Sequence, residues 1–415
     1  MARKRKPQRY YSGPSLTDHL DIKAGDLVEL TLGPLLDSGE AQAMLDGAPV
    51  MVAGGLPGEA VTAEVVKKFP ERIAAKVVGV RSGSPDRVTP PCPYYLACSG
   101  CQLMHASYPR QLEIKRERVA SEMAKHETLR GLDVSETMPS PQQFGYRNHA
   151  RFTIRRGGEL HGAVGYVNAT TRQFLKIDRC LLMDEGINAA LIAMQGRMQG
   201  MSQMSVRAGA DHLMIQPVLP ATGHGLASGQ KHIEEEVLGR RFRIAGPSFF
   251  QVNTAQLANL IGLIKTGLAL TGAEVVVDAY CGVGTFAILL ASYARKVIGI
   301  EDSASAVADA THNALGLTNV EFTEGKAEVV MAEVQDKVDA VVLDPPRAGC
   351  HPGTIEAVCR LRPERVALVS CEPASLARDL VALLNGPFML ESVQPVDMFP
   401  QTRHVEAVAF LKLAR

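Results

Sequence analysis

From about Gly239 to the C-terminus, short apolar runs alternate with stretches of helical pattern, and this alternation restricts the possible fold more than any other feature. Short runs rich in β-branched residues, with helices between them, are typical of parallel strands that are covered on both faces. The pattern therefore predicts a doubly wound α/β domain over residues 236–415. The clearest of these runs are Val275–Val277, Val297–Ile300, Val341–Leu343 and Val366–Val369.

The beginning of the chain has a different pattern. Short strand-like runs separated by Gly, Pro and Asp turns predict a small OB-like β-barrel, which we assign to residues 15–82. Residues 83–235 are also β-rich and form the predicted central domain, so that the 415 residues hold three domains. The predicted strands of the barrel are Leu27–Leu30, Ala48–Val52, Ala60–Val66 and Ile73–Val78.

The central segment contains a tight group of cysteines. Cys92, Cys98 and Cys101 lie close together, and Cys180 is a later candidate partner. Eight cysteines in 415 residues do not form a disulfide framework, so the group favours a metal site. Four thiolates suit zinc or an iron–sulfur cluster. Zinc sites usually have two paired knuckles, so a triplet plus a distant cysteine favours the cluster.

Two segments are candidates for binding nucleic acid. In the run from Phe144 to Arg156, Arg147, Arg151 and Arg155 fall on one face of a strand by period two. This arrangement suits phosphates and base stacking, although a solvated β face fits equally well. The basic segment Met1–Gln8 is either a solubilising tail or a phosphate-seeking arm. The chain has 44 basic and 44 acidic residues, so nucleic-acid binding must come from such local patches.

A glycine turn follows the first strand of the α/β domain, at Gly282 and Gly284, and Glu301 ends the next strand. Glycines let a ligand approach the backbone, and the acid can accept hydrogen bonds from ribose. Both NAD and S-adenosylmethionine fit these features. Asp278 before the turn favours S-adenosylmethionine, as does an Asp-Pro-Pro run starting at Asp344, which marks nucleic-acid methyltransferases.

Cys371 stands where the last predicted parallel strand ends and a helix begins at Pro373. The positive end of a helix dipole favours an anion, so a thiolate forms more easily there. A lone cysteine is, however, more often a small buried hydrophobic residue. The neighbouring Glu372 should raise the pKa of the thiol unless its carboxylate points away.

Together these motifs resemble the RNA (uracil-5-)-methyltransferase family, and in particular its bacterial 23S rRNA 5-methyluridine methyltransferases with a TRAM domain and an iron–sulfur cluster. The resemblance covers nearly the whole chain. The matching segments are Gly54–Glu59, the four cysteines, Tyr146–Asn148, Phe249–Asn253, Asp278–Gly284, Asp344–Gly349, Ser370–Pro373, Leu376–Asp379 and Phe399–Glu406.

The resemblance implies a role for each segment. Residues 15–82 would be the TRAM domain, the central domain would hold a 4Fe–4S cluster, and residues 236–415 would be the S-adenosylmethionine-dependent methyltransferase domain. Cys371 would be the nucleophile that adds to C6 of uracil, and Glu406 the base that removes the C5 proton. The implied cluster ligands are Cys92, Cys98, Cys101 and Cys180. The implied cofactor contacts are Gln251, Tyr280, Thr285, Glu301 and Asp344.

The sequence departs from the family pattern at three positions. Glu372 replaces the usual asparagine after the nucleophile, and Thr285 stands where asparagine is frequent. Lys326 lies near the position where Asp or Asn commonly meets the adenine. The first of these leaves one local question, which is the direction of the Glu372 carboxylate.

We expect a monomeric cytoplasmic enzyme whose RNA partner is 23S rRNA, because bacterial transfer-RNA enzymes of the family generally lack both the barrel and the cysteines. Transfer-RNA methylation by the same chemistry is an alternative. A catalytically inactive RNA-binding iron–sulfur protein and a nicotinamide-dependent enzyme are others. No apolar run approaches the roughly 18 residues of a membrane span, and the N-terminus lacks an apolar signal core.

Overall fold

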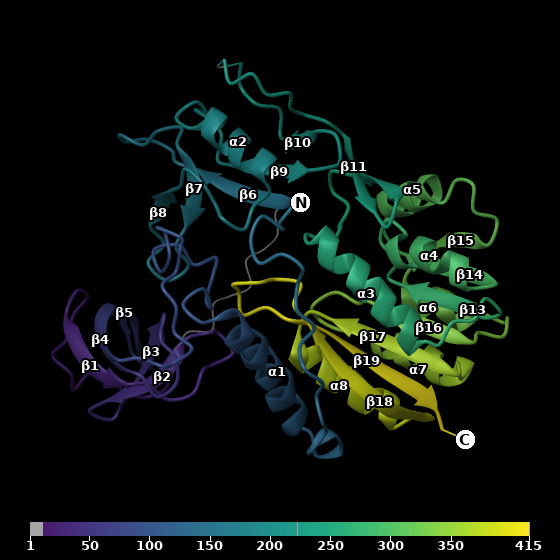
Figure 1. Ribbon diagram of the computed structural model, residues 1–415, viewed down its shortest axis with the longest axis horizontal. Helices are drawn as coiled ribbons and strands as arrows, with labels where there is room; N and C mark the ends of the chain where they lie inside the picture. The colour runs from purple at the N-terminus through teal and green to yellow at the C-terminus, as the bar shows by residue number, and fades with distance from the viewer. Residues whose placement is uncertain (1–10, 222, 415) are drawn as a thin grey trace. The chain divides into compact units, whose positions relative to one another are not determined.

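The computed structural model describes residues 11–221 and 223–414 (Figure 1). The basic segment Met1–Gln8 lies outside the described residues. The chain divides into two compact units. The first contains the residues up to Arg110 together with Val167–Leu175 and Gln401–Arg403, and the second contains Gln111–Tyr166, Lys176–Pro400 and His404–Arg415.

The first unit is built on a five-stranded sheet with the order β1-β4-β5-β3-β2. Its strands are β1 (Leu27–Thr31), β2 (Ala41–Leu45), β3 (Ala48–Ala53), β4 (Ala60–Phe69) and β5 (Arg72–Ser82). Alternate residues of β3 and β4, such as Val50 and Val61, are buried in one apolar cluster. The four predicted strands are confirmed. β2 escaped prediction because its alanines and Gln42 have little preference for strands.

The second unit begins with the central segment. Its sheet has the order β10-β9-β6-β7, and helix α2 packs against β9. Phe152 is fully buried and Arg151 is exposed, so the predicted alternation is confirmed within β6, whereas Arg147 and Arg155 lie outside this strand. The elements of residues 108–216 are α1 (Tyr108–Ala124), η1 (Glu127–Leu129), β6 (His149–Ile154), β7 (Val164–Val167), β8 (Phe174–Lys176), α2 (Glu185–Met194), β9 (Gln203–Ala208) and β10 (Leu213–Gln216). Of these, β8 belongs to the first unit except for Lys176.

The C-terminal part of the second unit forms a seven-stranded sheet with the order β15-β14-β13-β16-β17-β19-β18. A hairpin of β11 and β12 precedes it (Figure 1). The elements are β11 (His232–Val237), β12 (Arg240–Ala245), α3 (Thr254–Gly267), β13 (Val275–Ala279), α4 (Thr285–Leu290), η2 (Ala291–Tyr293), β14 (Lys296–Glu301), α5 (Ala304–Asn313), β15 (Val320–Glu324), α6 (Ala327–Glu333), β16 (Ala340–Leu343), α7 (Pro352–Leu361), β17 (Arg365–Ser370), α8 (Pro373–Leu384), β18 (Phe388–Val396) and β19 (Glu406–Leu413).

Two apolar clusters cover the two faces of this sheet. Val276 belongs to one cluster and its neighbours Val275 and Val277 to the other, as expected for a strand whose successive side chains point to opposite faces. The predicted doubly wound arrangement is confirmed for β13 to β17, which run parallel. The sheet is not parallel throughout, because β19 runs antiparallel to both β17 and β18.

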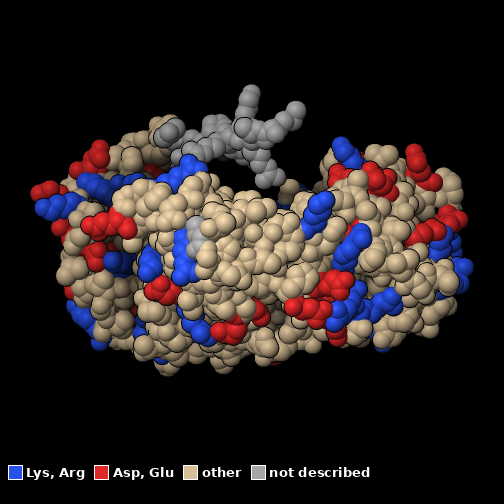
Figure 2. All heavy atoms as spheres, turned by 90° about the horizontal axis from the view of Figure 1, so that it is seen from above, with Lys and Arg blue, Asp and Glu red and all other residues tan. Residues whose placement is uncertain are grey.

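The surface carries charges of both signs. On the face drawn in Figure 2, basic and acidic side chains are interspersed among the described residues, in keeping with their equal numbers in the sequence. Among the helices of residues 11–221 and 223–414, none combines the length and the apolar character needed to cross a membrane.

Candidate active site

The carboxyl ends of the parallel strands bring several predicted residues to one edge of the sheet. Ala279 on β13 pairs with Ile300 on β14 and with Leu343 on β16. The next residue on each of the three strands is therefore a predicted cofactor contact: Tyr280, Glu301 and Asp344. In open α/β sheets this edge is where ligands bind.

The antiparallel pairing of β17 and β19 brings Cys371 and Glu406 together. Ser370 pairs with Ala407, so the same register sets Cys371 opposite Glu406 at the end of the ladder. The thiol is half-buried, and Glu406 is only 3% exposed. A carboxylate enclosed at this place is unlike the surface acid that its sequence context alone would suggest.

Charged groups near the thiol act on it in opposite directions. Burial and the charge of Glu406 raise the pKa of Cys371 to about 11, and Asp344 acts in the same sense. The Arg347 guanidinium lowers the pKa of the thiol, both by its charge and by a hydrogen bond. At neutral pH these shifts favour a protonated thiol, so formation of the thiolate depends on positive charge close to Sγ.

The two carboxyl groups that face the thiol are also shifted. Burial raises the pKa of Asp344 to about 7, although part of this residue remains accessible. Burial and the charge of Asp344 raise the pKa of Glu406 well above its usual range, and Arg347 opposes this shift. A carboxylate with a raised pKa binds a proton strongly, which is the property that a general base needs.

The Glu372 carboxylate is bound by an arginine from α1. Its Oε1 accepts a hydrogen bond of 3.0 Å from Nη2 of Arg118 on α1. The largest influences on the pKa of Cys371 are burial, Glu406, Arg347 and Asp344. Glu372, which the sequence predicts to hinder ionisation of the Cys371 thiol, is thus bound to Arg118.

The glycine turn after β13 has the features of a nucleotide-binding turn. Glu301 accepts hydrogen bonds from the backbone N–H groups of Gly282, at 3.0 Å, and Ser303, at 2.9 Å. Gly282 has a φ of 57°, and a Cβ built on it would meet no heavy atom within 4 Å. The turn therefore leaves open space beside a carboxylate that is fixed by the backbone, which fits a ribose.

Three further residues frame this turn. Asp278 is fully buried, and its Oδ2 accepts the Ala287 N–H at 2.9 Å, which ties β13 to α4. The Tyr280 hydroxyl lies 3.0 Å from Oγ1 of Thr354 on α7. Thr285 is the first residue of α4. The other carboxylate oxygen of Asp278 is buried without a hydrogen-bond partner, which leaves one buried acceptor beside the turn.

Gln251 lies in the segment that leads into α3 and is buried. Its carbonyl accepts a hydrogen bond of 3.2 Å from Nδ2 of Asn148, which also donates to Glu235 at 2.7 Å. Asn148 thus joins two of the sequence motifs. Sequence reasoning gave it no such role, because its partners lie 87 or more residues away. Phe249, two residues before Gln251, is 68% exposed.

The four predicted metal ligands fall in both units. Cys92, Cys98 and Cys101 belong to the first unit and Cys180 to the second, and all four thiols are half-buried. Within residues 11–221 and 223–414, no group of three or more His, Cys, Asp or Glu side chains is arranged to hold a metal ion. The described arrangement therefore does not by itself fit an iron–sulfur cluster.

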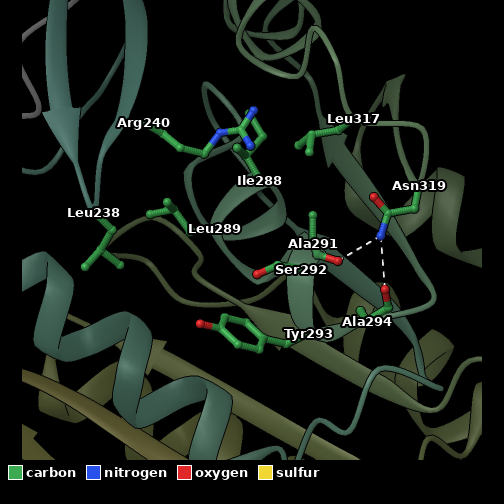
Figure 3. A pocket seen from close by; sticks show the side chains of 10 residues that line it. All are labelled: Leu238, Arg240, Ile288, Leu289, Ala291, Ser292, Tyr293, Ala294, Leu317 and Asn319. Atoms are coloured by element: carbon green, nitrogen blue, oxygen red, sulfur yellow. Dashed lines mark hydrogen bonds between the residues drawn. The ribbon is translucent and has the colours of Figure 1, made fainter.

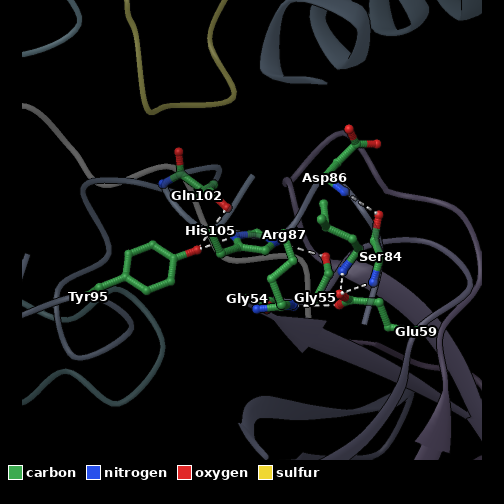
Figure 4. Close-up of polar contacts among 10 residues, drawn as sticks. Gly54, Gly55, Glu59, Ser84, Asp86, Arg87, Tyr95, Gln102 and His105 are labelled. Carbon is green, nitrogen blue, oxygen red and sulfur yellow. Dashed lines mark hydrogen bonds and ion pairs between the residues drawn. The ribbon is translucent and has the colours of Figure 1, made fainter. Parts of the chain in front are cut away.

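The cysteine segment is anchored to the sheet of the first unit by a polar network (Figure 4). The Tyr95 hydroxyl lies 2.5 Å from Nδ1 of His105, whose Nε2 lies 3.1 Å from the carbonyl oxygen of Gly55. Arg87 forms an ion pair with Glu59 and donates to the carbonyl of Gly54 at 2.8 Å. These contacts fix the backbone at Gly54 and Gly55 and the segment that contains Cys92, Cys98 and Cys101.

Two cavities lie away from the predicted catalytic residues. One of about 430 Å³ lies beside α4 and η2 and has mostly apolar walls (Figure 3). Its Asn319 amide donates to the carbonyls of Ala291 and Ala294, so this polar group is satisfied (Figure 3). The other, of about 570 Å³, lies on the central sheet and includes Arg151, Ser205 and Gln216 in its wall.

Comparisons with known proteins agree with this geometry. The sequence profile of the family described as tRNA (Uracil-5-)-methyltransferase matches residues 198–414, just over half of the chain. An uncharacterized RNA methyltransferase of Gloeobacter violaceus is 33% identical over 94% of this chain and 97% of its own length. Another, from Halalkalibacterium halodurans, is 31% identical over 94% of this chain and 98% of its own.

A solved structure is similar over almost the whole chain. It is the tRNA (uracil-54, C5)-methyltransferase of Pyrococcus abyssi in complex with S-adenosyl-L-homocysteine, with a TM-score of 0.74 and 26% identity. The alignment covers 92% of this chain and 99% of that one.

The doubly wound sheet, with its glycine turn and acidic strand ends, defines an S-adenosylmethionine-dependent methyltransferase. The chain belongs to the RNA (uracil-5-)-methyltransferase family.

Proposed function

We propose that the chain transfers a methyl group from S-adenosylmethionine to C5 of a uridine in 23S rRNA, through a covalent bond between Sγ of Cys371 and C6 of the base. One observation carries this proposal. The pairing of Ser370 with Ala407 sets a thiol and an enclosed carboxylate opposite each other at the ligand-binding edge of the sheet.

The chemistry requires these two groups. C5 of uracil is a poor nucleophile until the Cys371 thiolate adds to C6, which forms a C–S bond and makes C5 enolate-like. S-adenosylmethionine would supply an electrophilic methyl group, which C5 takes as the S–CH3 bond breaks and S-adenosyl-L-homocysteine leaves. Glu406 then accepts the C5 proton, the C5–C6 double bond forms again and the C6–S bond breaks. The thiolate is regenerated. The uracil must leave its stack to reach the thiol.

Arg347 would stabilise the negative charges of the reaction, and Asp344 would position the substrate or the cofactor. The guanidinium of Arg347 stabilises the thiolate that attacks C6 and the ionised form of Glu406. Asp344 would hold the uracil edge or the reactive end of the cofactor. The sulfonium charge of the methyl donor would favour the ionised forms of both nearby acids.

The remaining cofactor contacts follow from the turn. Glu301 would accept hydrogen bonds from the ribose hydroxyls while its own position is fixed by Gly282 and Ser303. Tyr280 and Thr285 would line the same space, and Gln251 would close it from the segment before α3. The register of the strands and the open space beside Gly282 support Tyr280 and Glu301, and the family resemblance implies Thr285 and Gln251.

For RNA binding, we propose the open face of the central sheet and a TRAM domain at residues 15–82. Arg151 is exposed in the wall of the 570 Å³ cavity, beside Ser205 and Gln216, and could bind a phosphate. The central domain would extend over residues 83–235 and the methyltransferase domain over 236–415. We propose further that the protein acts as a monomer in the cytoplasm.

The choice of 23S rRNA rests on the N-terminal sheet and the cysteine group, which the bacterial transfer-RNA enzymes generally lack. Transfer RNA is the second candidate, because the similar solved structure is named as a tRNA (uracil-54, C5)-methyltransferase. Mass mapping of RNA from a deletion strain separates the two. Loss of 5-methyluridine from a 23S fragment supports the first proposal, and its loss from transfer RNA alone supports the second.

A 4Fe–4S cluster on Cys92, Cys98, Cys101 and Cys180 is a separate proposal, and its support is the spacing of the cysteines. Anaerobic purification tests it. A brown protein that contains iron and sulfide, and that loses both in Cys98→Ala, supports the cluster. A colourless protein that contains zinc would show a zinc site instead, and a protein without metal would show that these cysteines bind none.

The mechanism is tested with RNA that carries 5-fluorouridine, in which fluorine replaces the proton that the base removes. The covalent complex then accumulates with the wild-type protein and is absent with Cys371→Ala. Adduct formation by Cys371→Ala would show that another residue is the nucleophile. A wild-type protein that binds RNA but forms no adduct and transfers no methyl group would favour the inactive RNA-binding alternative.

A further inference from the structure

Glu372 stands beside the nucleophile as the first residue of the turn that leads into α8. It is the N-cap of α8, yet its side chain forms no capping hydrogen bond with the helix. The backbone of this turn is fixed instead by Ser370, whose hydroxyl bonds to both the N–H and the carbonyl of Glu372 at 3.2 Å. The carboxylate is therefore free of any structural task within its own helix.

The partner of this carboxylate comes from a distant part of the chain. Arg118 on α1 lies 254 residues away in sequence, and its Nη2 donates to Oε1 of Glu372 at 3.0 Å. The Arg118 side chain is only 9% exposed, while that of Glu372 is 37% exposed. The arginine is thus nearly enclosed, whereas the glutamate is partly exposed, so the position of the guanidinium fixes the direction that the carboxylate takes.

We infer that Arg118 is a positioning residue for the nucleophile: it draws the Glu372 carboxylate away from Cys371 and from the N-terminus of α8. This inference rests on the proposed role of Cys371. It explains how a chain with an acid at this position, where the family usually has asparagine, can still form a thiolate.

The physical reason lies in the start of α8. The exposed N–H groups and the dipole at a helix N-terminus stabilise a negative charge nearby. Cys371 precedes the N-cap, so its thiolate uses this field. Without Arg118, the glutamate could turn toward the same N–H groups. A second negative charge would then compete with the thiolate and raise the pKa of the thiol.

Other charged groups act on the thiol or lie on the helices near it. Glu406 comes from β19, and Asp344 and Arg347 follow β16. Arg378 and Asp379, further along α8, form an ion pair with each other. On α1, Lys115 lies close enough to Arg118 for their charges to interact, and it forms an ion pair with Asp397. Arg118 is thus the cation that the structure assigns to Glu372.

The test measures the thiol itself. The full-length protein is alkylated with iodoacetamide over a range of pH, and mass spectrometry follows the peptide that contains Cys371. Arg118→Met should move the midpoint of the alkylation curve upward by about half to one pH unit, so that alkylation near pH 7 slows about three- to tenfold. Adding Glu372→Gln to this variant should restore the wild-type curve.

Arg116→Met is the matched control, because Arg116 lies on the same helix and pairs with Asp133. It should leave the curve unchanged. A shift in Arg118→Met that persists in the double variant would overturn the inference, since a purely structural role does not depend on Glu372. An unchanged curve in a folded Arg118→Met protein would also overturn it.

If Arg118→Met does not fold, Arg118→Lys takes its place. It keeps the charge but loses the geometry of the guanidinium, so a smaller upward shift is expected, again removed by Glu372→Gln. The wild-type 5-fluorouridine experiment remains independent of these curves. Absence of an adduct there would end the proposed mechanism, whereas the alkylation curves alone decide the role of Arg118.

Discussion

Lys115 and Asp397 form an ion pair in which both side chains are completely shielded from solvent. Lys115 lies on α1, and Asp397 directly follows β18, in the segment that leads toward Glu406. Lys115 also donates to the carbonyl of Phe399 at 3.0 Å. One helix side chain thus holds the chain that carries the proposed base, while Arg118 on the same helix holds the turn that carries the proposed nucleophile.

Removal of one partner of this pair should destabilise the protein strongly. Lys115→Met leaves a buried carboxylate without its counter-charge, and Asp397→Asn leaves a buried ammonium group. We expect either change to lower the free energy of unfolding by about 3–5 kcal/mol, measured by urea denaturation. Lys125→Met, which breaks the ion pair of Lys125, just after α1, with Glu122 on α1, should cost about 1 kcal/mol or less.

The double variant Lys115→Met with Asp397→Leu, compared with Lys115→Met and Asp397→Leu alone, sharpens this prediction. Because both charges are then absent, the loss should be much smaller than the sum of the single losses. Additive losses would show that the two side chains contribute independently and that their ion pair is not the main interaction.

Asp344 should make the second unit less stable as the pH rises. Its pKa is raised from the model-peptide value of 3.8 to about 7, so the folded protein binds the proton more tightly than the unfolded chain. The resulting stabilisation is complete below about pH 3.8 and is lost as the pH rises through 7. At pH 8 the ionised carboxylate of Asp344 therefore lowers the stability of the folded protein by roughly 2–4 kcal/mol, and Asp344→Asn should remove this loss.

Thermal melting at pH 5 and pH 8 checks the Asp344 prediction. The variant should gain more over the wild type at pH 8 than at pH 5, while methyl transfer is lost at both values. An equal gain at the two pH values would mean that the effect is not caused by titration of this carboxyl group. Asp302→Asn, at an exposed acid that follows β14, serves as the control.

Glu406→Gln should separate the two halves of the proposed reaction. Addition of the thiolate and methyl transfer need no base at C5, but release of the product does. The variant should therefore accumulate a denaturation-resistant complex with ordinary uridine RNA, and the complex should contain the transferred methyl group. Gel electrophoresis with a labelled methyl donor measures both properties.

Adding Cys371→Ala to the Glu406→Gln variant should abolish this complex. If Glu406→Gln released methylated RNA at the wild-type rate, the base would have to be another residue. If it formed no complex at all, Glu406 would be needed before methyl transfer rather than after it.

His105 should make the first unit sensitive to acid. Burial lowers the pKa of this histidine from 6.5 to about 4, which keeps the ring neutral between Tyr95 and Gly55. The unfolded chain binds the proton more tightly in this range, so stability is full above about pH 6.5 and falls as the pH drops toward 4. The loss should reach roughly 3 kcal/mol.

His105→Gln should flatten this acid dependence while lowering stability at neutral pH, and limited proteolysis of the first unit at pH 4.5 and pH 7.5 would detect both effects. His19→Gln, at an exposed histidine of the same unit, is the control. If the stability of His105→Gln fell with pH as steeply as that of the wild type, other groups would cause the acid sensitivity.

The parts of the fold that could be predicted are those whose signal is local. The apolar runs of β13, β14, β16 and β17 lie in a parallel ladder, with the predicted acids Glu301 and Asp344 at the carboxyl ends of β14 and β16. The turn at Gly282 could be recognised because glycine spacing and the preceding Asp278 are properties of a few consecutive residues. The antiparallel direction of β19 could not be predicted, since a strand pattern does not state which way the strand runs.

The network around the site escaped prediction for a related reason. The segment of α1 has a polar helical pattern that a solvated helix explains adequately, yet Lys115 is fully buried. Its partner Asp397 lies 282 residues away. Glu406 is likewise indistinguishable from a surface acid until β17 and β19 are paired. Long-range pairs of this kind leave no periodic signal in the sequence, so they become visible only when the chain is folded.

The pairing of β17 with β19 has a consequence for how this site can vary. The backbone hydrogen bonds of this ladder fix the distance between the two neighbouring strands at about 4.8 Å. Insertions between β18 and β19 can lengthen a loop without altering that spacing, whereas a one-residue slip within β19 would turn Glu406 to the opposite face. The reach between acid and thiol is therefore adjustable only through side-chain length, one methylene at a time.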